Sequence, residues 1–135
     1  MNHLLDTNVL ISLLDSAHEG FRASCDWFER LGRREAATCP TVENGALRYL
    51  LRTGINASDA LETLVEFKQG HRVGFAGEAD SMARQSLSGV TGHRQITDVY
   101  LCQVARSVNR TLATYDQALC RLRPELTTNL ALSAS

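Results

Sequence analysis

The chain has 135 residues, a net charge of −1 at pH 7 and 44% hydrophobic residues, a balance typical of a folded domain with its own core. This composition excludes a disordered chain and a nucleic-acid binder that relies on overall positive charge. No apolar run approaches the roughly 20 residues of a membrane-spanning helix, and no basic start leads into an apolar leader. We therefore expect one cytoplasmic domain over residues 1–135, not associated with a membrane, with a frayed tail at 131–135.

The cysteines and the positively charged residues bear on two kinds of site, zinc sites and nucleic-acid-binding sites. The four cysteines lie far apart without a CxxC pair, which argues against a structural zinc site. Lys68 is the only lysine among the 14 Lys and Arg residues. Because arginine suits bidentate contacts with phosphate, any nucleic acid is expected to bind at a local patch.

Short apolar segments alternate with helical patterns along the chain. We expect strands at residues 4–5, 36–39, 72–75, 111–114 and 126–130. We expect helices from residue 6 to 15 and at 17–32, 42–52, 56–69, 78–87, 97–109 and 116–122, with Thr41 as the cap of the third and a loop at 88–93. The alternation predicts a three-layer α/β/α sandwich with a mostly parallel central sheet of four or five short strands.

Two acids stand where expected strands end. Asp6 follows the buried pair Leu4 and Leu5, and Asp116 follows the strand at 111–114. Ligands of parallel α/β sheets bind at the carboxyl ends of the strands, so both acids are placed for chemistry. Each also has a simpler explanation, since aspartate is common in turns and at helix N-caps.

Two further acids open helices. Glu43 lies at helical spacing from Leu47 and Leu50, and Asp98 precedes Leu101 at the same kind of spacing. A buried, unpaired carboxylate costs several kcal/mol, so each of these acids needs a partner or a role. The alternative is that both occupy first turns, where the helix dipole favours an acid by about 0.3–1 kcal/mol.

All four acids would converge on one edge of the predicted sheet. In a chain with one lysine, the expected counter-charge is Mg²⁺ or Mn²⁺, which take oxygen ligands. One or two such ions would activate a water for in-line attack on a phosphodiester and neutralise the leaving oxygen. The four histidines are scattered, so no Ser-His-Asp or Cys-His arrangement competes.

Four segments carry a family likeness: LLDTNVLI (4–11), CPTVENGALR (39–48), GHRQITDVYL (92–101) and LATYD (112–116). In this order they resemble the PIN-domain ribonucleases, and more narrowly the VapC toxins of type II toxin–antitoxin pairs. The likeness covers nearly the whole chain, and all four acids are in place.

The resemblance implies an endoribonuclease that cleaves RNA with Mg²⁺ or Mn²⁺, inhibits translation and growth, and is silenced by a cognate antitoxin protein. It implies metal-binding catalytic roles for Asp6, Glu43, Asp98 and Asp116, and supporting roles for Thr7, Asn8 and Thr114. We also expect a homodimer, because the helices carry more apolar surface than one sheet can cover.

The resemblance also gives some polar residues a second interpretation. Arg94 and Gln95 precede Asp98 in an expected loop, and Arg48 lies one turn beyond Glu43. We expect these three to contact the RNA, Arg94 foremost. Solvated side chains, or pairs with neighbouring acids, explain them equally well.

Two other functions stay open. One is a catalytically inactive PIN-like module that acts only through partners, although a chain without chemistry has little reason to keep four repelling carboxylates. The other is a receiver-type signalling domain, which requires an acid pair after the first strand and a lysine late in the chain. Here only Asp6 follows the first strand, and Lys68 lies mid-chain.

Overall fold

A five-stranded parallel sheet forms the centre of the computed structural model, which describes residues 2–32 and 35–133. The strands are β1 (His3–Leu5), β2 (Ala36–Thr38), β3 (Gly74–Phe75), β4 (Thr111–Thr114) and β5 (Thr127–Asn129), in the spatial order β3-β2-β1-β4-β5. Every neighbouring pair is parallel. All carboxyl ends therefore lie along one edge of the sheet.

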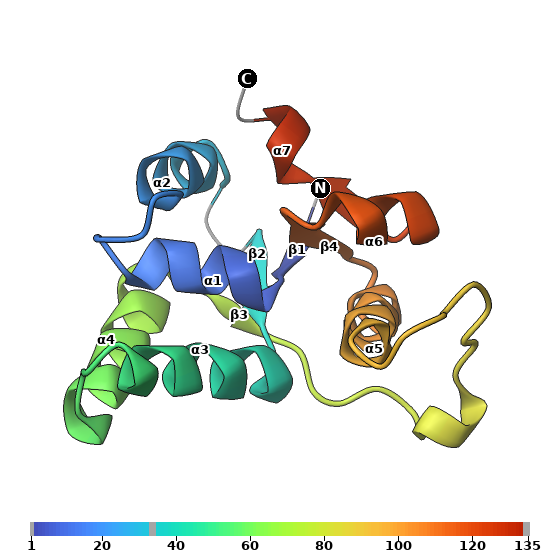
Figure 1. The fold of residues 1–135 in the computed structure, drawn as a ribbon. Helices are drawn as coiled ribbons and strands as arrows, with labels where there is room; N and C mark the ends of the chain where they lie inside the picture. The colour runs from blue at the N-terminus through green and yellow to red at the C-terminus, as the bar shows by residue number, and fades with distance from the viewer. Residues whose placement is uncertain (1, 33–34, 134–135) are drawn as a thin grey trace.

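Helices cover both faces of this sheet (Figure 1). The helices are α1 (Thr7–Leu14), α2 (Phe21–Glu29), α3 (Pro40–Arg52), α4 (Ala57–Gly70), α5 (Gln95–Ser107), α6 (Gln117–Leu122) and α7 (Leu130–Ser133), with a 3₁₀ turn η1 (Met82–Arg84). In Figure 1, α1 to α4 lie on the left of the sheet and α5 and α6 on the right, as right-handed crossovers require. The predicted three-layer α/β/α sandwich is confirmed.

The central strand β1 is the reference for the site. Leu4 and Leu5 are completely buried, because a central parallel strand is covered on both faces. Leu5 pairs with Ala113 of β4, and the backbone N–H of Asp6 donates to the Ala113 carbonyl at 2.9 Å. This pairing holds the end of β1, and with it Asp6, against the end of β4.

The helix predicted at 78–87 is wrong, because only the short turn η1 forms there. Side chains in this segment bond to nearby backbone groups: Asp80 accepts from the N–H of Ser81, and Ser81 accepts from the N–H of Ala83. The Gln85 amide donates to the carbonyls of both Asp80 and Ser81. Such local bonds compete with the helical ladder.

Several predicted boundaries also change. α3 begins at Pro40 with Cys39 in the cap position, so Thr41 lies inside the helix, since proline fits a first helical position. α2 spans fewer residues than the predicted 17–32. Of the tail predicted to be frayed, residues 131–133 belong to α7, and residues 134 and 135 lie outside the described part. Over residues 2–32 and 35–133, no helix is long and apolar enough to cross a membrane.

Candidate functional site

Asp6 sits at the junction of β1 and α1, where it caps the helix. Its Oδ1 accepts from the N–H of Thr7 at 2.7 Å, and its Oδ2 accepts from Thr114 Oγ1 at 2.7 Å. The residue is only 5% exposed. Burial raises the pKa of the Asp6 carboxyl, and the two hydrogen bonds oppose that rise. Asp6 is therefore a fixed, buried carboxylate at the centre of the edge.

Thr114, the last residue of β4, connects the acids of the two central strands. Its fully buried hydroxyl donates to Asp6. The same oxygen accepts from the backbone N–H of Asp116 at 3.0 Å and from Asn8 Nδ2 at 3.4 Å. The Asn8 side chain in turn accepts from the N–H of Tyr115. The structure thus brings Thr7, Asn8 and Thr114 beside Asp6, as the sequence predicts, and their supporting role stays a prediction.

Asp98 and Asp116 complete a cluster of aspartates. Asp116 caps α6 and accepts from the N–H of Leu119 at 3.0 Å. Asp98 lies in the first turn of α5 and is partly buried. Burial, followed by the charges of Asp6 and Asp116, raises the pKa of Asp98 to about 6. The three side chains therefore share one region of negative charge.

Glu43, in the first turn of α3, has different surroundings. Its Oε2 accepts from Thr38 Oγ1 at 2.5 Å and from Lys68 Nζ at 2.5 Å. Glu43 is also absent from the charges that raise the pKa of Asp98. In this structure Lys68, the only lysine in the sequence, supplies a positive charge beside Glu43, and the role of Glu43 as a metal ligand stays a prediction. Lys68 is 25 residues away on α4, so this contact leaves no local signal in the sequence.

A pocket of about 500 Å³ adjoins this edge, with Thr7, Asn44, Gly45 and Arg48 in its wall. Helices α1 and α3 lie very close here, since a Cβ on Gly45 would stand 2.8 Å from Thr7 Cγ2. Any larger residue at position 45 would have to displace the Thr7 side chain, so glycine suits this close approach. Arg48 lies on the same wall, and its contact with RNA stays a prediction.

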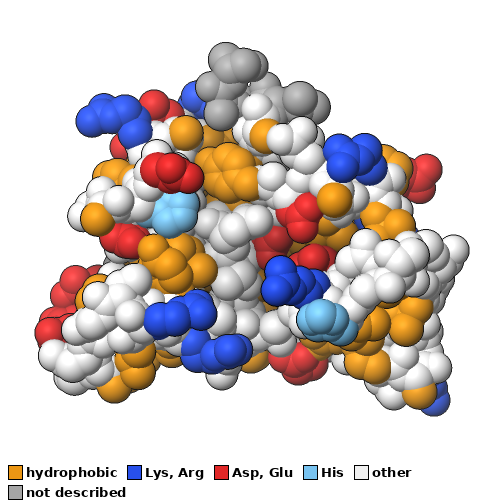
Figure 2. Space-filling model, in the orientation of Figure 1, with side chains coloured by type: hydrophobic (Ala, Val, Ile, Leu, Met, Phe, Trp, Pro, Cys, Tyr) orange, Lys and Arg blue, Asp and Glu red, His pale blue; other side chains and the backbone are white. Residues whose placement is uncertain are grey.

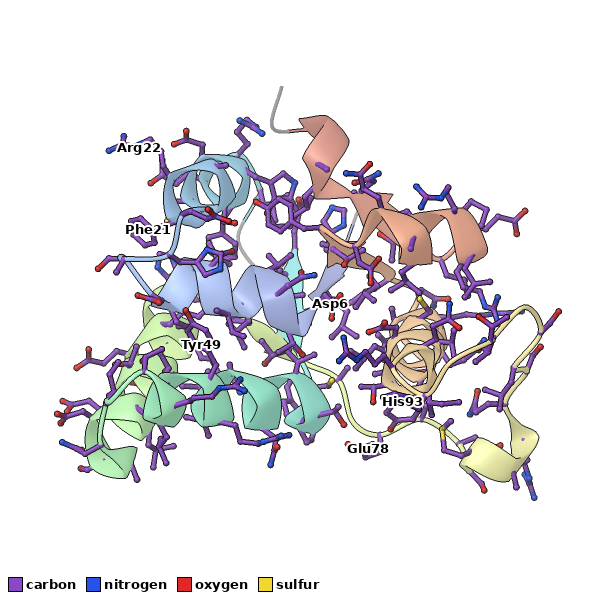
Figure 3. All side chains as sticks on the ribbon, in the orientation of Figure 1. Asp6, Phe21, Arg22, Tyr49, Glu78 and His93 are labelled. Atoms are coloured by element: carbon purple, nitrogen blue, oxygen red, sulfur yellow. The ribbon has the colours of Figure 1, made fainter. Side chains whose placement is uncertain are left out.

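The same pocket contains an acid that the sequence analysis missed. Glu78 lines it and lies on the segment that follows β3 (Figure 3). The Tyr100 hydroxyl donates to its carboxylate. The rule that singled out Asp6 and Asp116, an acid just after a strand, also applies to Glu78. The incorrect helix at 78–87 concealed it.

Of the two loop residues predicted to bind RNA, one has a side chain held by hydrogen bonds and the other is exposed. Gln95 Oε1 accepts from the N–H groups of Thr91 and Gly92 at 2.7 and 3.1 Å, so this side chain closes its own loop. Arg94 is exposed just before α5. In Figure 2, acidic side chains gather in the hollow between α1 and α5, with cationic side chains at its rim.

The aspartate cluster suits a hard divalent cation. In the part of the chain that the structure describes, no three His, Cys, Asp or Glu side chains converge closely enough to hold a metal ion alone. Mg²⁺ keeps several waters and usually takes only one or two carboxylates from a protein. Asp6, Asp98 and Asp116 offer oxygen ligands, and a cation would offset both the burial of Asp98 and its repulsion by the other two charges, which together raise the pKa of Asp98.

Comparisons with known proteins agree with this architecture. The PIN domain matches residues 3–124. Ribonuclease VapC29 of Mycobacterium tuberculosis is 38% identical over 126 residues, 93% of this chain and 94% of the relative. Ribonuclease VapC38 of the same species is 31% identical and covers 88% of each chain. The crystal structure of FitAcB from Neisseria gonorrhoeae shares the fold, with a TM-score of 0.57, 16% identity and coverage of 95% and 97%.

The chain belongs to the PIN-domain family, because the PIN domain matches residues 3–124. The parallel sheet with aspartates at its carboxyl edge agrees with this assignment. Within that family its similarity is to the VapC ribonucleases. The predicted resemblance is therefore confirmed.

Proposed function

We propose that the protein is a metal-dependent endoribonuclease that hydrolyses RNA phosphodiester bonds and is the toxin of a toxin–antitoxin pair, inhibiting translation and growth. The observation that carries the proposal is the cluster of Asp6, Asp98 and Asp116 at the carboxyl edge of the sheet. Its support is family membership together with relatives named VapC ribonucleases. An inactive interaction module and a receiver-type domain have no comparable support.

In this proposal the three aspartates hold Mg²⁺ or Mn²⁺, directly or through water. When bound, the cation polarises the phosphodiester and neutralises charge on the leaving oxygen. Thr114 and the N–H of Thr7 orient Asp6, so one ligand is fixed before the ion arrives. Asn8 secures Thr114. Glu43 adds an acid beside Thr38, with Lys68 as its partner.

We expect the RNA substrate and the antitoxin to bind at the carboxyl edge of the sheet. RNA would lie over the pocket beside Thr7, with Arg48 and Arg94 contacting phosphates and Gln95 a weaker candidate. A cognate antitoxin protein would silence the enzyme by covering the acidic edge, and both would act in the cytoplasm. A homodimer is consistent with the exposed Leu61 and Val65 of α4.

Cleavage of total RNA tests the proposal. Purified protein is incubated with RNA in Mg²⁺, in Mn²⁺ or in chelator, beside the Asp6→Asn and Asp98→Asn variants. We expect each variant to cut at least about 100-fold more slowly, since each removes a metal ligand. Asp26→Asn is the matched control, because Asp26 is an exposed aspartate on α2, and its rate should stay within about two-fold of the unsubstituted protein.

Cutting in chelator, or cutting retained in both site variants, would contradict the mechanism. Melting curves of each variant separate loss of chemistry from loss of fold. A second arm adds the product of any small gene immediately upstream, which we expect to suppress cutting and to co-purify with the protein.

A further inference from the structure

Three hydroxyl groups form a hydrogen-bonded chain beside the aspartate cluster. Ser12 of α1 and Ser24 of α2 are completely buried, and their oxygens lie 2.5 Å apart. The Ser24 oxygen lies 2.6 Å from the phenolic oxygen of Tyr115. Ser12 also bonds to the carbonyl of Val9 at 2.7 Å. This hydroxyl chain links two helices to the junction between β4 and α6.

The direction of each bond in the hydroxyl chain follows from its protons. A hydroxyl has one proton to donate, and a carbonyl can only accept. Ser12 donates its proton to the Val9 carbonyl, so it accepts from Ser24. Ser24 has then used its only proton, so it accepts from Tyr115. The Tyr115 phenol is therefore a donor, and its acceptor is held between α1 and α2.

Tyr115 is also attached to α1 through its backbone. Its N–H donates to Asn8 Oδ1 at 3.4 Å, and α1 is the helix that Asp6 caps. The next residue is Asp116, whose own N–H donates to Thr114 Oγ1 at 3.0 Å. The segment that carries Asp116 is therefore tied to the same helix as Asp6, at both the backbone and the side chain of Tyr115.

The two aspartates lie close enough to interact. Burial and, as a smaller contribution, the charge of Asp116 raise the pKa of the Asp6 carboxyl. A cation that binds carboxylates from separate elements needs both of them held in place by packing and by hydrogen bonds to surrounding groups. Apolar side chains would join α1 to α2 without the cost of burying hydroxyls. A directed chain of hydroxyls also fixes the position of the segment between β4 and α6.

We propose that Tyr115 is a positioning residue of the metal site, which holds Asp116 in place beside Asp6. The inference rests on the proposed function. In this role Tyr115 touches neither the cation nor the RNA, and acts only through the residue that follows it. Ser24 and Ser12 provide the anchor for its hydroxyl.

The affinity for Mn²⁺ tests the inference without reference to activity. Metal-free protein is titrated with Mn²⁺, and the free ion is followed by electron paramagnetic resonance. Tyr115→Phe keeps the ring but removes the donor, and we expect its Kd for Mn²⁺ to rise about 10-fold, as when an outer partner of a metal ligand is lost. Ser24→Ala removes the acceptor and should raise the Kd by a similar factor. The double variant should bind no more weakly than either single variant, because both changes break the same chain.

Tyr49→Phe is the matched control. The Tyr49 hydroxyl donates to Asp15 at 2.8 Å, at the opposite end of α1 from Asp6 (Figure 3). This variant loses one phenol hydrogen bond but keeps the hydroxyl chain, so its Kd should stay within about two-fold of the unsubstituted protein. A purely structural chain would lower the melting temperature of Tyr115→Phe and leave its Kd unchanged.

The outcomes separate this inference from the proposed function. An unchanged Kd in a folded Tyr115→Phe variant, an equal rise in Tyr49→Phe, or multiplied effects in the double variant would overturn the role of Tyr115 and leave the nuclease intact. No Mn²⁺ binding by the unsubstituted protein would overturn the metal dependence and this inference with it. If Tyr115→Phe fails to fold, the Kd of Ser24→Ala decides the same question.

Discussion

Two parts of the same sheet edge carry acids in opposite electrostatic states. At the ends of β1 and β4, Asp6 is held by neutral donors and shares a negative region with Asp98 and Asp116. At the ends of β2 and β3, Glu43 is neutralised by Lys68. The comparison teaches that an acid's position in the sequence indicates where it lies. It does not indicate which cation lies beside the acid in the folded protein.

The largest expected effect on stability comes from breaking the aspartate side. Thr114→Val keeps the shape of the buried side chain but removes the donor to Asp6 and the acceptor of the Asp116 N–H and the Asn8 amide. Because the carboxylate is left short of a hydrogen bond in a buried place, we expect a loss of about 2–3 kcal/mol in the free energy of unfolding. Urea denaturation in chelator measures it.

Thr111→Val, on the same strand, is the matched control. Its hydroxyl bonds only to Thr128 and His3 at a half-buried position, so the expected loss is at most about 1 kcal/mol. Equal losses in both variants would show that the hydrogen bonds of the Thr114 hydroxyl contribute no more to stability than those of Thr111.

A second prediction concerns pH in the metal-free protein. The pKa of Asp98 is about 6 in the folded state, against an ordinary 3.8. Between these values the folded state retains a proton that the unfolded state has lost, so stability falls as pH rises from about 4 to about 6. Allowing for partial exposure, the fall is on the order of 1–2 kcal/mol.

Asp98→Asn should remove this part of the slope, whereas Asp26→Asn should keep it. Denaturation of the three proteins across that pH interval measures the difference between the curves. Identical curves for the unsubstituted protein and Asp98→Asn would contradict the prediction. Millimolar Mg²⁺ should raise the melting temperature near neutral pH, because the ion binds only the folded state.

The smallest effect is expected from the paired side. A double-mutant cycle with Lys68→Met and Glu43→Gln should give a coupling of about 1 kcal/mol, since both side chains are largely but not fully shielded. The exposed pair Arg84 and Asp80, at 3.4 Å, is the control and should give a coupling near zero. A Lys68–Glu43 coupling no larger than the control would mean that the ion pair does not form in solution.

The sequence predicts the acids of the central strands because their signals are local. An apolar strand, an aspartate and a helical period follow one another at both Asp6 and Asp116, and parallel strands bring such ends together. The parallel sheet and its three layers follow from the same alternation. Only the short turn η1 forms in the segment 78–87, because side chains there satisfy the backbone locally.

The Glu43–Lys68 pair could not be predicted in this way. It joins α3 to α4 across 25 residues, and hydrophobic period carries no information about which charged side chains meet. With a single lysine in the composition, the sequence predicts no lysine beside an acid. One lysine is enough to neutralise Glu43 when it is held next to that side chain.

The hydrogen bond between Asp6 and Thr114 spans 108 residues, which has a consequence for synthesis on the ribosome. The first acid is made almost at once, but the strand that orients it emerges only after most of the chain. Such long-range pairing forms late in folding. A nascent chain that stops before β4 lacks both Thr114 and Asp116. The aspartate cluster can therefore form only when synthesis of the chain is nearly complete.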